Sequence, residues 1–236
     1  MLAPTGGAAP QPFVAAHRDE RFDVKDAAPG IAGVVSITGA SSNSGKTGAA
    51  VRSIRALKEL GHQVTALKIT RTHTTRCPRE NDDCGVCESL EDDYEIVTAI
   101  DRLDVRGKDT GRYVEAGADQ VLWLLVRPAA TATGVRAVLK MVTPGHVLVA
   151  EGNSFRDVAS ADLTLMAVSE RERTKPSAYA ILERIDAVVI CGAVGPRAEE
   201  VAEVISGERH PFVQAEDLAA WLRNALETRG IVFGPK

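Results

Sequence analysis

The chain has 236 residues, a formal net charge of −4, 44% hydrophobic residues and 25% charged residues. This composition is typical of one globular domain that is large enough to bury a substantial core. The negative charge argues against a dedicated nucleic-acid-binding protein, and no apolar run approaches the roughly 18 residues that a membrane span needs. The N-terminus lacks the basic region and apolar stretch of a secretory signal, so we expect a cytoplasmic protein.

Residues 1–30 are rich in alanine, proline and glycine and carry scattered charges. This composition predicts a flexible or loosely docked arm. Residues 31–236 then form one domain, in which apolar periodicity predicts alternating strands and helices. The strands are expected at residues 31–38, 63–69, 119–126, 146–151, 161–168 and 186–191, and the helices at 46–60, 89–101, 108–117, 131–142, 176–184, 196–206 and 215–228.

Three of the predicted strands contain runs that are apolar throughout, at residues 121–126, 147–150 and 187–190. Such runs suit central strands that are covered by helices on both faces. We therefore predict an α/β fold with three layers and a mostly parallel central sheet. In sheets of this kind ligands bind at the carboxyl ends of the strands, so the loops that follow the strands are the candidate sites.

The apolar run at 31–38 leads into Gly39-Ala-Ser-Ser-Asn-Ser-Gly-Lys-Thr47, and a helical pattern follows. In a strand, loop and helix of this kind, backbone N–H groups surround a phosphate, the lysine adds positive charge and the threonine hydroxyl can ligate Mg²⁺. A glycine-rich and serine-rich turn formed by chance is the alternative, but the flanking strand and helix argue against it. Ala40 stands at the usual first glycine, which the loop tolerates if φ stays negative there.

We therefore predict a P-loop NTPase fold that binds ATP or GTP together with Mg²⁺. The expected nucleotide-binding residues are Ser42, Asn43, Ser44, Gly45, Lys46, Thr47 and Gly48. The Asn-Lys-x-Asp motif that reads guanine is absent, so the choice between adenine and guanine stays open.

Three charged residues lie at the ends of predicted elements near this loop. Glu151 ends a buried strand, where an acidic group would hold Mg²⁺ together with Thr47. Lys68 ends another strand and is expected to reach the terminal phosphate or an acidic substrate. Asp109 begins a helix, either as its N-cap or as a further Mg²⁺ or substrate contact. The predicted catalytic residues are Lys46, Lys68 and Glu151, and the alternative for Lys68 and Glu151 is a solvated strand-end charge.

A cysteine-rich insertion is expected over residues 72–90, where Cys77, Cys84 and Cys87 fall within eleven positions. The spacing between the last two cysteines is that of a metal knuckle, and His73 would complete four ligands for zinc. An iron–sulfur cluster with one non-cysteine ligand, a redox-active dithiol and a loop with incidental cysteines are the other interpretations. A metal would rigidify a long loop that has no core of its own, which favours the metal site.

The chain resembles a branch of P-loop proteins that includes the dethiobiotin synthetases. These enzymes have a glycine six residues before Gly-Lys-Thr, as Gly39 stands to Gly45 here. They also have a lysine at the end of the second strand, like Lys68, and a Glu-Gly pair after a later strand, like Glu151-Gly152.

The middle of the chain resembles a second family of that branch, the molybdopterin-guanine dinucleotide biosynthesis protein B (MobB) family. The similar segments are Lys68-Ile-Thr-Arg-Thr-His73 and Gly107-Lys-Asp-Thr-Gly-Arg-Tyr-Val-Glu-Ala-Gly-Ala118. The likeness to the two families covers about residues 31–155 and implies that Lys46 and Thr47 serve phosphate and Mg²⁺. It also implies that Asp109 and Glu151 serve Mg²⁺ and that Lys68 serves phosphate or substrate.

The leading hypothesis is a Mg²⁺-dependent hydrolase of GTP or ATP that assists maturation of a metal-containing cofactor of the molybdopterin type. The first alternative is an ATP-dependent kinase or ligase for a small molecule, of the dethiobiotin synthetase type. The second is a nucleotide-dependent switch or metal chaperone. The expected partners are the nucleotide, a small substrate or a cofactor-biosynthesis protein, and a second copy of the chain in a homodimer, without nucleic acid or membrane.

Overall fold

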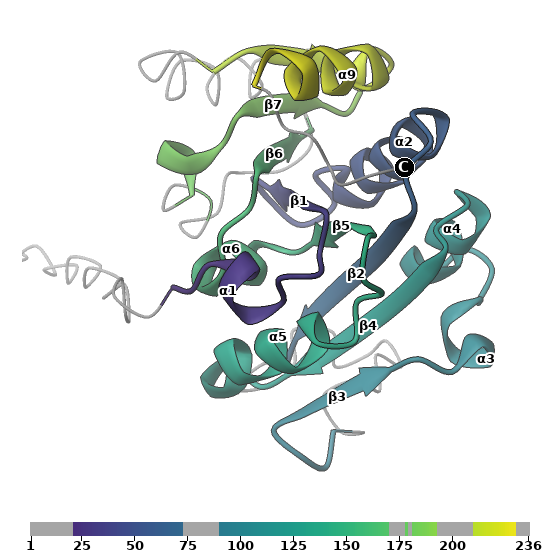
Figure 1. The fold of residues 1–236 in the computed structure, drawn as a ribbon, viewed down its shortest axis with the longest axis vertical. Helices are drawn as coiled ribbons and strands as arrows, with labels where there is room; N and C mark the ends of the chain where they lie inside the picture. The colour runs from purple at the N-terminus through teal and green to yellow at the C-terminus, as the bar shows by residue number, and fades with distance from the viewer. Residues whose placement is uncertain (1–20, 73–89, 170–177, 179–180, 193–209, 230–236) are drawn as a thin grey trace, which may run out of the picture.

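The computed structural model describes residues 21–72, 90–169, 178, 181–192 and 210–229. The fold is built on an eight-stranded sheet with the order β3-β4-β2-β5-β1-β6-β7-β8, shown in Figure 1. All neighbouring strands are parallel except the pair of β3 and β4. The strands are β1 Gly33–Gly39, β2 Val64–Arg71, β3 Tyr94–Val97, β4 Gln120–Val126, β5 Val147–Glu151, β6 Leu163–Val168, β7 Ala187–Ile190 and β8 Phe212–Gln214.

Helices cover both faces of this sheet. Residues of α2, α4 and α9 share one buried cluster with the sheet, and residues of α1, α5 and α6 share a second cluster on the opposite face. The helices are α1 Val24–Ala27, α2 Lys46–Glu59, α3 Ile100–Leu103, α4 Asp109–Glu115, α5 Thr131–Leu139, α6 Asn153–Val158 and α9 Leu218–Thr228, with short 3₁₀ turns at Pro128–Ala130 and Leu182–Arg184. The predicted three-layer α/β fold with a mostly parallel sheet is therefore confirmed.

Strand β1 lies inside the sheet between β5 and β6, and all seven of its residues are buried. Its sequence, Gly-Val-Val-Ser-Ile-Thr-Gly, has apolar side chains on both faces, as a strand between two helical layers requires. The glycine-rich loop leaves the carboxyl end of β1 and leads directly into α2. The sheet therefore presents this loop between the ends of two other parallel strands.

The helix predicted at 89–101 is wrong. The structure has strand β3 at Tyr94–Val97 and the single turn of α3 at Ile100–Leu103 instead. Tyr94 and Ile96 pack toward one buried cluster and Val97 belongs to the other, which is the alternation of a strand. Pairing with the long neighbour β4 decided the conformation, and β3 runs antiparallel at the edge of the sheet.

The arm predicted over residues 1–30 is too long at its C-terminal end. Residues 21–30 belong to the folded domain, because Val24 in α1 is 1% exposed and Phe22 forms a β-bridge with Ala159. Residues 1–20 lie outside the described part of the chain.

The helix predicted at 196–206 lies outside the described residues, and the one predicted at 176–184 lies partly outside them, with its described end forming the 3₁₀ turn Leu182–Arg184. The short strand β8 was not predicted, and its buried Val213 pairs alongside β7. The helix predicted at 215–228 is present as α9. Among the described residues, no helix is long and apolar enough to cross a membrane.

Candidate functional site

The loop after β1 is tightly wound, and two of its glycines cannot be replaced without a clash. Gly45 has φ of 90°, and a Cβ atom there would lie 2.3 Å from the Cβ atom of Cys191. A Cβ atom on Gly39 would lie 2.3 Å from Ser44 Oγ and 2.7 Å from Lys46 Cγ. The strand, the wound loop and the N-terminus of α2 together have the form of a phosphate-binding P-loop.

Ala40 fits the loop although most P-loops have glycine there. Its φ is not positive, since Asn43 is the one non-glycine residue of the described chain with positive φ. The Ala40 N–H donates to the Ala167 carbonyl of β6 at 3.1 Å, and the residue is 3% exposed. The alanine therefore continues the strand pairing of β1 by one residue before the loop turns.

Side chains from three other segments hold this loop in place. The Asn153 amide accepts a hydrogen bond from the Gly39 N–H at 2.9 Å and donates to the Gly39 carbonyl at 3.0 Å. The Ser169 hydroxyl donates to the Asn43 carbonyl at 3.3 Å, and Cys191 Sγ lies 3.7 Å from the Gly45 carbonyl oxygen. The sequence pattern did not identify these residues, although all three follow strands whose carboxyl ends neighbour the loop.

Within the loop, the predicted binding residues divide by exposure. Ser42 and Asn43 are exposed, whereas Gly45, Lys46, Thr47 and Gly48 are partly exposed along the start of α2. The Lys46 ammonium group folds back and donates to the Ser41 carbonyl at 2.9 Å. Ser44 is buried, and its hydroxyl has no hydrogen-bond partner among the described residues.

Five polar and charged side chains form a connected group that begins at Thr47 and extends away from the loop. The Thr47 hydroxyl donates to Asp109 Oδ1 at 2.9 Å, and the other oxygen of Asp109 lies 2.6 Å from the Lys68 ammonium nitrogen. Lys68 also pairs with one carboxylate oxygen of Glu151, whose second oxygen accepts a hydrogen bond from the Tyr113 hydroxyl. We call these five residues the charge cluster.

The fold explains why the charge cluster assembles. Lys68 on β2 and Glu151 on β5 are direct partners in the parallel register of adjacent strands. Asp109 and Tyr113 lie one turn apart on α4, so one helix supplies both remaining side chains. Tyr113 was missed in the sequence, although its spacing of four residues from Asp109 on a predicted helix could have identified it.

Burial and the opposite charges set the protonation of the cluster. Burial alone would lower the pKa of Lys68, but the carboxylates of Glu151 and Asp109 outweigh it and raise that pKa above its usual 10.5. Burial opposes ionisation of Asp109, yet Lys68 and the Thr47 hydroxyl hold its pKa below 3.8. Burial, followed by the charge of Glu151, raises the pKa of Tyr113 well above 10.0. Lys68 and Asp109 are therefore charged at neutral pH, and Tyr113 is a hydrogen-bond donor.

Only one end of the charge cluster, at Thr47 and Asp109, has oxygen ligands that are accessible to Mg²⁺. The Thr47 hydroxyl and the Asp109 carboxylate are adjacent oxygen ligands, which Mg²⁺ prefers, and the Asp109 side chain is 41% exposed. Asp109 and Glu151 both have their two oxygens engaged, but Glu151 is 1% exposed and is therefore closed to a cation from solvent. As arranged here, Glu151 positions Lys68, and the predicted Mg²⁺ contact falls to Thr47 and Asp109.

The four predicted ligands of the cysteine-rich insertion, His73, Cys77, Cys84 and Cys87, lie outside the described residues. Within the described part of the chain, no group of three or more His, Cys, Asp or Glu side chains could hold a metal ion. Cys191, the fourth cysteine of the sequence, is a free thiol, and burial raises its pKa.

Comparison with known proteins found similar folds among solved structures. No protein-family model matches the chain, and no curated protein matches its sequence. The hydrogenase maturation factor HypB of Archaeoglobus fulgidus has a TM-score of 0.46 at 15% identity, over 86% of this chain and 95% of that one. A MobB homolog of Bacillus stearothermophilus has a TM-score of 0.39 at 19% identity, over 83% and 99%.

A third similar structure is LpxK of Aquifex aeolicus, solved in complex with ATP. Its TM-score is 0.41 at 14% identity, over 77% of this chain and 70% of that one. At these low identities the similarity concerns the fold alone.

Proposed function

We propose that this protein is a Mg²⁺-dependent nucleoside triphosphatase. The observation that carries the proposal is the hydrogen-bonded connection from Thr47 through Asp109 to Lys68, beside the P-loop lysine Lys46. Two lysines and a hydroxyl–carboxylate pair next to a phosphate-binding loop are the groups that stabilise a transferring phosphoryl group.

Each residue has a role that follows from its contacts. Backbone N–H groups of the loop and of the α2 N-terminus bind the phosphates, and Lys46 turns from the Ser41 carbonyl to the terminal phosphate. Thr47 and Asp109 would hold Mg²⁺, which when bound neutralises charge on the phosphate oxygens. Lys68 stabilises the charge that develops on the terminal phosphate, and Glu151 holds its ammonium group in place.

Intrinsic turnover should be slow, because no carboxylate of the charge cluster is suited to deprotonate water. Lys68 keeps the pKa of Asp109 low, so this carboxylate is a weak base and a good cation ligand. Glu151 is buried with both oxygens engaged. The catalytic contribution of the described residues is therefore electrostatic.

The role in maturation of a metal-containing cofactor is a proposal that is supported by the resemblance of residues 68–73 and 107–118 to MobB proteins. Transfer of the phosphoryl group to a small acceptor is the second candidate, because the side chains of Lys68 and Asp109 are 18% and 41% exposed and a polar substrate can contact them. Together with the role in cofactor maturation, we propose that the protein forms a homodimer and acts with a partner protein from cofactor biosynthesis.

The test is release of free phosphate and nucleoside diphosphate from ATP and from GTP, with and without Mg²⁺. We expect Lys46→Ala to reduce turnover by at least about a hundredfold, which is the effect of losing one preorganised charge contact. Lys58→Ala is the matched control, because Lys58 lies on the same helix and pairs with Asp119 at 2.7 Å, away from the loop. Equal release of both products indicates hydrolysis, and diphosphate without free phosphate indicates transfer. Normal turnover by Lys46→Ala would refute the proposal.

A further inference from the structure

Tyr113 is the member of the charge cluster to which the proposed function gives no role. Its side chain is 1% exposed and packs in the buried cluster that α2, α4 and α9 share with the sheet. The ring therefore has no surface to offer to a nucleotide or a substrate. The hydrogen bond of its hydroxyl goes to the Glu151 carboxylate. Any contribution of Tyr113 to the reaction must therefore pass through Glu151.

The Tyr113 hydroxyl completes the set of donors around Glu151. One carboxylate oxygen of Glu151 accepts a hydrogen bond from the Lys68 ammonium group, and the other accepts one from Tyr113. The terminal torsion of a glutamate side chain has broad energy wells, so a carboxylate that is held at one oxygen can still turn. A second donor at the other oxygen fixes the plane of the group. Because a lysine ammonium group sits on a flexible four-carbon stem, a fixed carboxylate in turn fixes the direction of that stem.

Packing of the ring does not account for the hydroxyl of Tyr113. A phenylalanine ring has the same shape and would fill the same space in this apolar cluster. A buried hydroxyl is costly to desolvate unless it forms a hydrogen bond, and here it forms one with a carboxylate. Burial and the charge of Glu151 raise the pKa of Tyr113 well above 10.0, so the hydroxyl keeps the proton that it donates. The hydroxyl therefore serves the Glu151 carboxylate rather than the packing of the core.

Close contacts with the preceding segment fix the part of α4 that presents Tyr113. A Cβ atom on Gly111 would lie 2.3 Å from the Val105 carbonyl oxygen, so the segment before the helix packs directly against its first turn. The Thr110 hydroxyl donates to the Leu103 carbonyl at 2.7 Å, and Thr110 is 6% exposed. The helix therefore holds the tyrosine in place by contacts that lie outside the charge cluster.

We propose that Tyr113 is a positioning residue for phosphoryl transfer, which holds the Glu151 carboxylate so that the Lys68 ammonium group meets the charge that develops on the terminal phosphate. This inference rests on the proposed function and deepens it. A contact that strengthens as charge develops lowers the barrier to the chemical step and adds little to nucleotide binding. Loss of the Tyr113 hydroxyl should therefore slow that step and leave the affinity for nucleotide unchanged.

The test measures the rate constant of a single turnover with the protein in excess, together with the dissociation constant of the nucleotide. ATP and GTP are both used, with Mg²⁺, at a temperature at which every variant is folded. We expect Tyr113→Phe to lower the rate constant by about tenfold or more, the effect of a misplaced charged group, and to change the dissociation constant by less than about twofold. Tyr94→Phe is the matched control and should keep the wild-type rate constant, because Tyr94 lies on β3 and packs toward the opposite face of the sheet.

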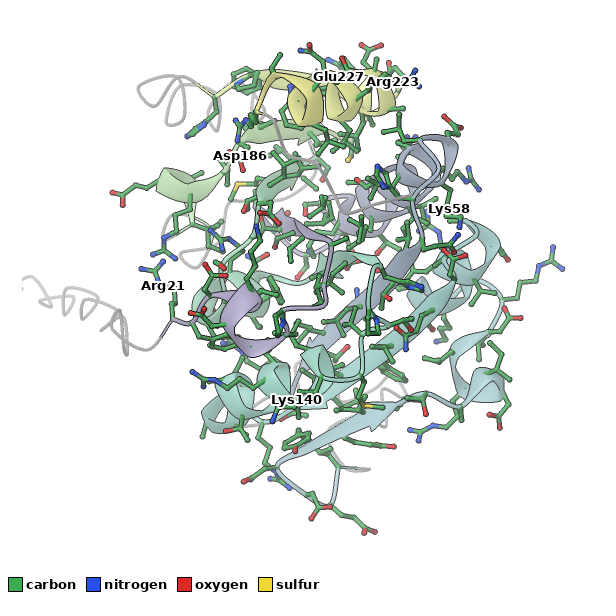
Figure 2. All side chains as sticks on the ribbon, viewed as in Figure 1. Arg21, Lys58, Lys140, Asp186, Arg223 and Glu227 are labelled. Atoms are coloured by element: carbon green, nitrogen blue, oxygen red, sulfur yellow. The ribbon has the colours of Figure 1, made fainter. Side chains whose placement is uncertain are left out.

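A second set of variants separates positioning from a general loss of structure. Lys68→Met combined with Glu151→Gln removes the ammonium group that Tyr113 would position and keeps the net charge unchanged. In that background we expect Tyr113→Phe to have no further effect on the rate constant, because residues that act through one another are not additive. The control background is Lys140→Met with Glu227→Gln, the same two changes at exposed positions that end α5 and lie on α9 (Figure 2). In the control background Tyr113→Phe should keep its full effect.

Three outcomes would overturn this inference. The first is a wild-type rate constant in Tyr113→Phe. The second is an equal loss of rate from Tyr113→Phe in the Lys68→Met and Glu151→Gln background, which would show that the tyrosine acts without the lysine. The third is weaker nucleotide binding by Tyr113→Phe, which would give the hydroxyl a purely structural role. In each case turnover by the wild type and its loss in Lys46→Ala would still support the proposed triphosphatase. Absence of turnover in the wild type overturns the proposed function itself, and this inference with it.

Discussion

Replacing Lys68 by methionine tests the charge cluster most directly. The side chain of Lys68 is 18% exposed and that of its partner Glu151 is 1% exposed, so the change leaves a buried carboxylate without its counter-charge. Removal of one partner from a buried pair costs about 3–5 kcal/mol. The Asp109 side chain is 41% exposed, so water screens it and its lost contact adds little. For a domain of this size the loss corresponds to a melting temperature lower by about 6–20 °C.

The assay is thermal and urea denaturation of Lys68→Met, Glu151→Gln and the double variant. Glutamine removes the buried charge and keeps the shape, so we expect the double variant to recover most of the stability that Lys68→Met loses. Lys58→Met is the control, because its pair with Asp119 is 28% and 27% exposed and should cost about 1 kcal/mol or less. If Lys68→Met were as stable as the wild type, or if the double variant recovered nothing, the unpaired carboxylate of Glu151 would be excluded as the cause of a stability loss.

Lys68 and Asp109 of the charge cluster give a pH dependence with a definite sign. The pKa of Lys68 is raised, so its contribution to stability is present below 10.5 and is lost as the pH rises through the higher folded value. The pKa of Asp109 is lowered, so its contribution is present above 3.8 and is lost as the pH falls through the lower folded value. The stability difference between wild type and Lys68→Met should therefore be largest between about pH 5 and 9 and shrink outside that range. A difference that grows under acidic conditions would contradict this assignment.

Two further substitutions, one of them with a glycine control, test the backbone of the loop and the Tyr113 hydroxyl of the charge cluster. Gly45→Ala combines a φ of 90° with a Cβ atom 2.3 Å from the Cβ atom of Cys191, so we expect a loss of about 2–5 kcal/mol in urea denaturation, together with loss of nucleotide binding. Gly61→Ala, with φ of 87° and open space around the new atom, should cost only about 1–2 kcal/mol, and equal costs would exclude the contact with Cys191 as a cause. Tyr113→Phe removes the hydrogen bond to the buried Glu151 and should cost about 1–3 kcal/mol, so wild-type stability of this variant would show that the hydroxyl is dispensable.

Local patterns in the sequence predicted the parts of this protein in which nearby residues decide the structure. The run at 31–38, the glycines of the loop and the helical periodicity after Lys46 predict a strand, a phosphate-binding loop and a helix, and the structure has all three. Apolar runs predicted β4, β5 and β7, because strands covered on both faces have no polar side to interrupt them. Asp109 was predicted, from the start of its helix and from the resemblance, to contact Mg²⁺ or substrate; the structure joins it to Thr47 by a hydrogen bond, and the Mg²⁺ contact stays a prediction.

Only the tertiary structure decided which strands become neighbours and which side chains meet. Tyr94–Val97 is a strand because β4 offers it an edge to pair with, and Glu151 binds Lys68 because β2 and β5 are adjacent in register. The Asn153 amide reaches Gly39 across 114 positions of sequence. These contacts join segments that are distant in the chain, and their energies come from pairing and burial after the sheet has formed, so no local pattern encodes them. The sequence alone therefore determined the phosphate-binding loop and pointed to the charged residues near it, and the assembled sheet determined how those charged residues pair with one another.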